Sequence, residues 1–308
     1  IDESGKRLWV YAKKVSGKLT TARNIVGILL LVFFFTAPFI KINGQQLLLF
    51  NVLERRFVIF GIQFWPQDLN LFFIAMIALI VFIILFTATY GRLWCGWACP
   101  QTVFMEIVFR RIEYWIDGDA SAQRAMDKAP WNAGKIFKRA LKHGIYYLIA
   151  FVIGNYFLMY IIGSDQWRNL VTDDPARHIT GLSAMIIFSF IFYFIFSWFR
   201  EQVCTIVCPY GRLQGVLLDR NSIVISYDYK RGEERSPVRK GENRAEVGKG
   251  DCVDCHQCVV VCPTGVDIRN GTQLECINCA LCIDACDAVM KRVGFRTGLI
   301  RYASEKML

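Results

Sequence analysis

Eight cysteines near the C-terminal end of this 308-residue chain constrain its fold more than any other feature. They form two runs with identical spacing, Cys252-x2-Cys255-x2-Cys258-x3-Cys262 and Cys276-x2-Cys279-x2-Cys282-x3-Cys286. Three closely spaced cysteines followed by a fourth are typical of 4Fe-4S cluster ligands, whereas structural zinc sites use separated pairs. The runs therefore predict a small α+β ferredoxin unit with two clusters, over residues 251–290.

The assignment of ligands follows from the bacterial two-cluster pattern, in which the fourth cysteine of each run ligates the other cluster. One cluster is then held by Cys252, Cys255, Cys258 and Cys286. The second cluster is held by Cys276, Cys279, Cys282 and Cys262. Because each run supplies a ligand to both clusters, we expect the two runs to fold as one unit.

The rest of the composition indicates a membrane protein, since 54% of the residues are hydrophobic and 24 are Phe. Four stretches are free of charged side chains and are each close to the ~20 residues that cross a bilayer. They are residues 24–40, 69–90, 143–162 and 179–199. The predicted fold is an α-helical integral membrane protein whose four transmembrane helices, within residues 24–227, form two repeated hairpins.

Basic residues predict the orientation, because Lys and Arg stay on the cytoplasmic side of short loops. They are frequent in the N-terminal segment, residues 1–23, and between the second and third stretches, but scarce in residues 41–68 and 163–178. Both termini and the ferredoxin unit should therefore face the cytoplasm of a bacterial inner membrane. The net charge of +10 then reflects topology and contact with membrane lipid, and does not require nucleic acid. A reducing cytoplasm also makes disulfides improbable.

The remaining cysteines form a repeated motif, Cys-x3-Cys-Pro, after the second and fourth stretches. The motifs are Cys95 and Cys99 before Pro100, and Cys204 and Cys208 before Pro209. Spacing of four predicts both sulfurs of a pair on one helix face. The proline suits the first position of a following helix, which would place Cys99 and Cys208 at helix N-termini, where the dipole lowers a thiol's pKa.

Two identical pairs predict one shared site of four sulfur ligands. Soft thiolates select Cu(I), zinc or an iron-sulfur cluster, and the spacing leaves open whether the site holds copper or a third cluster. His143, at the start of the third stretch, is a candidate for a further ligand or a group beside this site. A haem with a single protein ligand also stays open.

Three other segments complete the domain organisation. Residues 101–117 have apolar and charged side chains at helical spacing, which predicts an interfacial helix on the cytoplasmic membrane surface. Residues 228–250 are rich in charge and Gly and read as a solvated linker. Residues 291–308 are polar and basic, as the approach to a further span would be.

These motifs together resemble those of the cytochrome c oxidase accessory proteins of the CcoG or FixG type, which are membrane polyferredoxins. The resemblance rests on both cysteine runs and on Gly-Arg-Leu-Trp-Cys-Gly-Trp-Ala-Cys-Pro-Gln at residues 91–101. It also rests on residues 111–119, residues 204–211 and Gly-Leu-Ile-Arg-Tyr at residues 298–302. In that family a further span and a periplasmic immunoglobulin-like domain follow the ferredoxin unit, so we expect both beyond Leu308.

The resemblance implies a Cu(II) reductase that supplies Cu(I) on the cytoplasmic side for assembly of cbb-type cytochrome oxidases. The Cys-x3-Cys-Pro cysteines would be its copper motif, and a cytoplasmic donor would supply electrons one at a time through the clusters. A copper-transporting ATPase or copper chaperone and oxidase assembly factors would be its partners.

Two other classes of function remain. Membrane subunits of nitrate-reductase systems share this architecture, which suggests a quinol-oxidising electron-transfer subunit; against it, no acidic residue or His lies deep in a predicted span to accept a proton. The third class is a copper-binding assembly scaffold without turnover, which has no evident need for two relay clusters.

Overall fold

A computed structural model describes the chain except for residues 1–8, 53, 65–68, 175–177, 240–243 and 245. It consists of two compact units, each built from separate parts of the sequence. The first unit contains Ile1–Gly27, Ile83–Pro130 and Glu201–Leu308. The second contains Ile28–Phe82 and Trp131–Arg200. All twelve cysteines belong to the first unit.

Four long helices in the described residues are apolar enough to cross a membrane, as the sequence predicted. They are α1 (Lys18–Thr36), α2 (Leu69–Tyr90), α7 (Ala133–Ile162) and α9 (Ile179–Phe194). A 3-10 turn, η1 (Ala37–Phe39), continues α1, and a π-helical turn, η5 (Ile195–Phe199), continues α9. Their lengths and composition allow each of them to span a bilayer.

Helix α7 begins well before the apolar stretch at residue 143. The Asn132 side chain caps it by accepting a hydrogen bond from the backbone N–H of Lys135 at 3.0 Å. The helix ends at Gly163, which has a φ of 91°. Glycine adopts this positive φ readily, whereas other residues adopt it at a steric cost. The basic segment before residue 143 is therefore helical and continuous with the apolar part.

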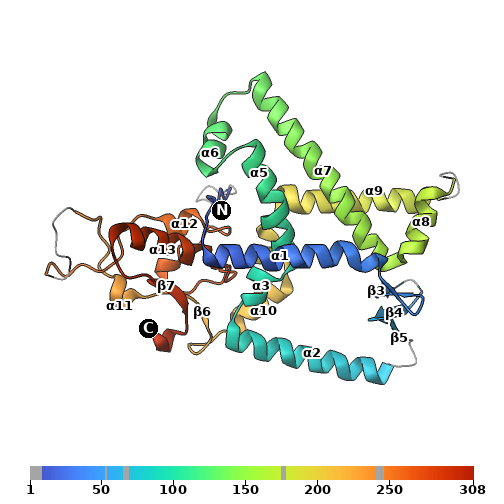
Figure 1. The fold of residues 1–308 in the computed structure, drawn as a ribbon, viewed down its shortest axis with the longest axis horizontal. Coiled ribbons are helices and arrows are strands. Elements are labelled where there is room, and N and C mark those ends of the chain that lie inside the picture. The colour runs from blue at the N-terminus through green and yellow to red at the C-terminus, as the bar shows by residue number, and fades with distance from the viewer. Residues whose placement is uncertain (1–8, 53, 65–68, 175–177, 240–243, 245) are drawn as a thin grey trace. The chain divides into compact units, whose positions relative to one another are not determined.

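In the second unit, α7 crosses α9 and packs closely against it (Figure 1). Small residues permit this approach, because a Cβ on Gly154 would lie only 3.1 Å from Ser189 Oγ. Aromatic rings fill the neighbouring space, with Phe157 centred 5.0 Å from Phe192 and 5.0 Å from Phe34. Packing of small and aromatic side chains thus holds these apolar helices together.

The connection between α1 and α2 contains short strands that the sequence analysis did not predict. Strands β1 (Lys41–Ile42) and β2 (Gln45–Gln46) form a hairpin. Strands β3 (Leu48–Asn51), β4 (Arg56–Ile59) and β5 (Ile62–Phe64) form an antiparallel sheet in which Leu48 pairs with Ile59. Helix α8 (Ser164–Thr172) follows α7. Strands β1 to β5 are too short to show a clear alternation of apolar and polar residues, which is why the sequence did not reveal them.

The first unit begins its helical part with α3 (Leu93–Trp97), α4 (Pro100–Val103), the π-helical η3 (Phe104–Phe109), α5 (Arg110–Ile116) and α6 (Ala120–Lys128). The helix expected over residues 101–117 is therefore present. Two of its charged residues, Arg110 and Glu113, are buried in the protein and do not form part of an exposed polar face, whereas Trp115 is 78% exposed. Arg110 Nε lies 2.9 Å from Glu106 Oε1, and this ion pair offsets the cost of burial.

The C-terminal part of the first unit surrounds the ferredoxin runs. Its elements are η6 (Val203–Val207), α10 (Pro209–Leu217), β6 (Val224–Tyr227), α11 (Tyr229–Gly232), α12 (Gln257–Val260), η7 (Ile268–Asn270), α13 (Leu281–Val293), β7 (Ile300–Ala303) and η8 (Glu305–Met307). Strands β6 and β7 are antiparallel, with Val224 opposite Ala303. Ile225, Met290 and Ile300 are almost fully buried in the core.

The segments on either side of the ferredoxin runs are packed against them. Arg244, within the segment predicted as a solvated linker, donates to the carbonyls of Ser236 at 3.1 Å and Cys252 at 3.0 Å. Arg231 is paired with Asp251 at 2.7 Å. The polar C-terminal segment contributes β7 to the sheet. Arginine side chains thus bind carbonyls of the cluster region, which composition alone does not reveal.

Candidate iron-sulfur and thiolate sites

The two cysteine runs have the same local conformation. Asp254 and Asn278, which precede the second cysteine of each run, have φ of 53° and 54°. His256 and Ala280, which follow that cysteine, have φ of 53° and 65°. Left-handed residues alternating with others turn successive backbone N–H groups to one side, an arrangement that binds anions and many iron-sulfur clusters. Identical spacing therefore produces the same left-handed conformation on both sides of the second cysteine in each run.

Short helices position the third cysteine of each run. His256 and Ala280 are the N-cap residues of α12 and α13, so Cys258 and Cys282 lie in the first helical turn. Cys286 lies farther along α13, whereas the other run leaves its helix before Cys262. The fourth cysteines are thereby directed to the neighbouring run.

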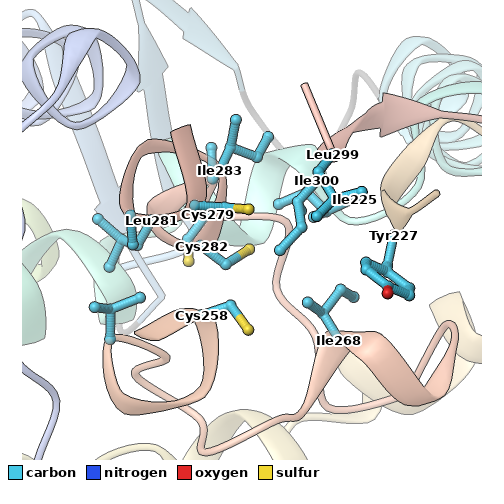
Figure 2. Packing of buried hydrophobic residues seen from close by; sticks show 14 of the residues in the cluster. Ile225, Tyr227, Cys258, Ile268, Cys279, Leu281, Cys282, Ile283, Leu299 and Ile300 are labelled. Atoms are coloured by element: carbon cyan, nitrogen blue, oxygen red, sulfur yellow. The ribbon is translucent and has the colours of Figure 1, made fainter. Parts of the chain in front are cut away.

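One set of four sulfurs lines a single small cavity of about 20 Å³ in the core. These cysteines are Cys262, Cys276, Cys279 and Cys282, which is the second ligand set expected from the sequence. Cys258, Ile225 and Ile268 also line the cavity. Figure 2 shows Cys258, Cys279 and Cys282 among these apolar side chains. The fourth cysteine of the first run thus lies with the three of the second.

The other set is grouped around Cys286. Burial raises the pKa of this thiol to about 12, and the neighbouring Cys258, Cys252 and Cys255 act in the same direction. Cys286 is therefore close to the first three cysteines of the other run, as the crossed pattern requires. Cys255 is exposed, whereas the other three are buried. This set is consequently the more accessible of the two.

The donors fit 4Fe-4S clusters in chemistry and surroundings. Each set offers four sulfurs, most of which lie in the apolar core while Cys255 is exposed, and the backbone N–H of Val266 donates to Cys262 Sγ at 3.3 Å. Burial raises the pKa of Cys276 to about 12, so cluster binding must displace protons. In the described residues no three Cys, His, Asp or Glu side chains stand at metal-ligand spacing.

The Cys-x3-Cys-Pro segments place their second cysteines at helix N-termini, as predicted. Cys99 and Cys208 are the extended N-cap residues of α4 and α10, each followed by proline at the first helical position. For the first pair, the expectation that both sulfurs share one helix face is wrong. Cys95 lies in α3, which ends at Trp97, because Pro100 cannot donate the hydrogen bond that would continue that helix.

The four cysteines of these segments are neighbours, although they come from distant parts of the sequence. Burial raises the pKa of Cys95 to about 12, and Cys99 and Cys208 act in the same direction. Burial also raises the pKa of Cys204 to about 12, again with Cys99 and Cys95 nearby. For both thiols desolvation is the largest cause and outweighs the opposing positive charge of Arg92.

The first of these segments lies directly against the ferredoxin core. A Cβ on Gly96 would be 2.4 Å from the carbonyl oxygen of Ile277, so only glycine permits this approach. Trp97 Nε1 donates to the Tyr302 hydroxyl at 3.1 Å, and this hydroxyl donates to the carbonyl of Asn278 at 2.7 Å. The segment with Cys95 thus touches the loop between Cys276 and Cys279.

Two side chains that the sequence analysis missed connect the parts of this site. Arg92 is buried and donates to the carbonyls of Gly211 and Leu274. The fully buried Gln214 accepts a hydrogen bond from Cys95 Sγ at 3.1 Å. Arg92 lies within the motif residues 91–101, but nothing in the sequence indicates its partners. Both residues connect the two Cys-x3-Cys-Pro segments.

His143 lies in α7 of the second unit, so its predicted place beside the four cysteines of the first unit stays a prediction. Its Nδ1 lies 2.9 Å from the Tyr193 hydroxyl on α9. The described structure thus gives His143 a hydrogen-bond partner within its own unit.

Comparisons with known proteins agree with the geometry. Residues 199–305 match the model of a 4Fe-4S dicluster domain, and residues 72–119 match that of a 4Fe-4S binding domain. No solved structure gave a significant match. The matched regions and the helices define an iron-sulfur electron-transfer protein with four helices that can span a membrane.

The curated relatives identify the family. The chain is 39% identical to nitrogen fixation protein FixG of Rhizobium meliloti, over 97% of its own length. It is 35% identical to protein RdxA and 36% to protein RdxB of Cereibacter sphaeroides, over 95% and 96% of its length. It spans between 58% and 63% of the length of these relatives. Over the length that it spans, the chain belongs to the FixG or CcoG-type family.

Proposed function

We propose that this protein reduces Cu(II) to Cu(I) at the sulfurs of Cys95, Cys99, Cys204 and Cys208. The observation that carries the proposal is that two distant Cys-x3-Cys-Pro segments meet, with Cys95 on a helix that contacts the ferredoxin core. Four sulfurs form a soft site that favours Cu(I) over Cu(II). Each copper ion takes up one electron, and bound 4Fe-4S clusters supply electrons singly.

Each group of residues at the proposed copper site has a separate role. The cysteines bind copper, and Gln214 orients the Cys95 sulfur through their hydrogen bond. Arg92 places positive charge beside a site that becomes anionic when thiols lose their protons. Gly96 keeps the copper ligands next to the ferredoxin loop. Short separation is what electron transfer to the substrate requires.

The wider setting of the proposal comes from the family resemblance. Two repeated hairpins, each ending in Cys-x3-Cys-Pro, would hold the site at the cytoplasmic face of the inner membrane. The product would serve assembly of a cbb-type cytochrome oxidase. A cytoplasmic electron donor, a copper-transporting ATPase or chaperone, and oxidase assembly factors would be the partners.

The test is anaerobic metal analysis followed by a single-turnover reaction. Iron, sulfide and copper are counted in the purified protein, and Cu(II) is added to dithionite-reduced, desalted samples. We expect about eight iron atoms per chain and one Cu(I) formed for each electron lost. Replacing Cys95 and Cys99 by Ser should abolish copper binding while the iron content stays constant, and Thr205→Ser serves as the control. Unchanged copper reduction by the double variant would overturn the proposal.

A third cluster is the second candidate for the four cysteines, and the match of residues 72–119 to a 4Fe-4S binding domain favours it. About twelve iron atoms per chain, falling to about eight in the Cys95 and Cys99 variant, would identify this arrangement. Rapid oxidation by a quinone without transfer to copper would indicate the quinol-oxidising class. Copper binding without reduction would indicate a scaffold.

A further inference from the structure

A second cavity in the first unit has no part in the proposed copper chemistry. Its volume is about 580 Å³, within the range of roughly 300–1,000 Å³ typical of small-molecule sites. The N-terminal segment around Lys13, the first turns of α1 and the helical segment η3–α5 line it. Val261 and Leu281 of the ferredoxin region complete its wall. Segments distant in the sequence thus enclose one space.

The lining is strongly cationic. Five basic side chains and one carboxylate face the cavity: Lys13, Lys14, Arg23, Arg110, Arg111 and Glu106. The carboxylate is already paired with Arg110 at 2.9 Å. Lys13, Lys14 and Arg111 are exposed, and no ion pair joins them to a carboxylate among the described residues. The cavity therefore favours an anion.

Arg110 contributes a fixed charge in the wall. It is 3% exposed, and within the described part of the chain its Nη2 has no hydrogen-bond partner. The guanidinium cannot lose its proton in a protein, so this positive charge is permanent. Arg23 is also buried and is fixed by donating from Nε to the carbonyl of Gly96 at 2.8 Å. Because Glu106 offsets the charge of Arg110, the net positive charge that attracts the anion comes from Arg23 and from the exposed Lys13, Lys14 and Arg111.

The cavity lies at the beginning of a helix that can span a membrane. Thr20, Arg23 and Asn24 are in the first turns of α1, whose apolar part follows. Trp115, another lining residue, is 78% exposed, and tryptophan is enriched at the level of lipid headgroups. Basic pockets at the cytoplasmic ends of spans bind anionic phosphates of lipids.

We propose that this cavity binds the phosphate of an anionic phospholipid, with Lys13, Lys14 and Arg111 as the contacting cations. A soluble phosphate compound has the same binding chemistry, and the experiment below separates the two sources. The site adjoins the electron-transfer core, because Val261 and Leu281 are next in sequence to Cys262 and Cys282. A bound phosphate would thus place negative charge beside the second cysteine set.

The test measures binding to the full, cluster-containing chain by native mass spectrometry in detergent. Phosphatidylglycerol, phosphatidylcholine, inorganic phosphate and ADP are titrated separately into delipidated protein. The variant replaces Lys13, Lys14 and Arg111 by Gln. We expect selective binding of phosphatidylglycerol by the native chain and a loss of affinity on the order of 100-fold in the variant, since each basic residue contributes about fivefold.

A matched variant controls for net charge. It replaces Lys128, Lys291 and Arg292 by Gln, three exposed basic residues that do not line the cavity, and should bind as the native chain does. Unchanged iron content shows that both variants fold, and the exchange of Lys13 and Lys14 for Arg should preserve binding. Equal phosphatidylglycerol affinity in the two triple variants would overturn the site. Tighter binding of ADP than of phosphatidylglycerol would overturn the lipid assignment.

Discussion

The ferredoxin runs and the Cys-x3-Cys-Pro segments both gather four sulfurs, but by different means. In the runs, local spacing sets left-handed residues and helix starts that are the same in both halves. In the other segments, Cys95 and Cys204 become neighbours only through packing around Arg92 and Gln214. Local sequence therefore builds the first kind of site, whereas tertiary contacts build the second. Variants that separate these contributions test the comparison.

The largest effect should follow from Cys282→Ser. This buried residue of α13 lines the small sulfur cavity, and the crossed ligands make each set depend on the other run. We expect loss of at least about four iron atoms per chain and a failure of the ferredoxin core to fold stably. Iron analysis and electron paramagnetic resonance measure the cluster content. Cys95→Ser is the control and should retain about eight iron atoms per chain. Full iron content in Cys282→Ser would refute the assignment.

Arg269→Gln should have the next largest effect. We expect this effect only in the ferredoxin runs, and not in the Cys-x3-Cys-Pro segments. Arg269 is buried and lies 2.5 Å from Asp254 and 2.7 Å from Asp267. Because both carboxylates are partly exposed, we expect a loss of about 2 to 3 kcal/mol in the free energy of unfolding, with faster bleaching of the clusters. Denaturant titration under anaerobic conditions measures it. Arg235→Gln, which breaks a more exposed pair with Glu233, should cost less than about 1 kcal/mol.

Gly96→Ala tests the contact between the two kinds of site. Its Cβ would meet backbone atoms of Ile277 and Asn278, so the segment with Cys95 must move. We expect a loss of about 1 to 2 kcal/mol and slower copper reduction, without a change in iron content. Gly144→Ala is the control, because among the described residues only the neighbouring backbone of its own helix lies within 4 Å of its Cβ, and it should be neutral or slightly stabilising. Equal behaviour of the two variants would mean that the contact is unimportant.

Tyr302→Phe should have the smallest effect. It removes the hydroxyl that joins Trp97 to the carbonyl of Asn278. Loss of these hydrogen bonds should cost about 1 kcal/mol and leave both cysteine sets intact. Thermal unfolding and iron analysis measure the two quantities. A large loss of iron would show that the contact supports the ferredoxin core as well as the segment with Cys95.

Much of the membrane architecture was predictable because it depends on composition. Charge-free stretches identified four helices, and the structure adds mainly the earlier start of α7 at its Asn132 cap. The strands between α1 and α2 were missed, since segments such as β1 and β2 have only two residues each. The buried charged face of α5 was also missed, because an ion pair such as Glu106 with Arg110 is invisible to a hydropathy pattern.

The sequence by itself determined the two cysteine runs and the helix N-termini at Cys99 and Cys208, and it predicts the crossed ligand sets. These features depend on spacing and on proline, which act over a few residues. The repeated motif predicted that Cys95 and Cys99 share a site with Cys204 and Cys208. Only the tertiary structure supplied the packing that makes them neighbours and raises the pKa of Cys95 and Cys204 by burial. The physical reason is that desolvation and proximity depend on which distant segments enclose a side chain, and local sequence does not specify that enclosure.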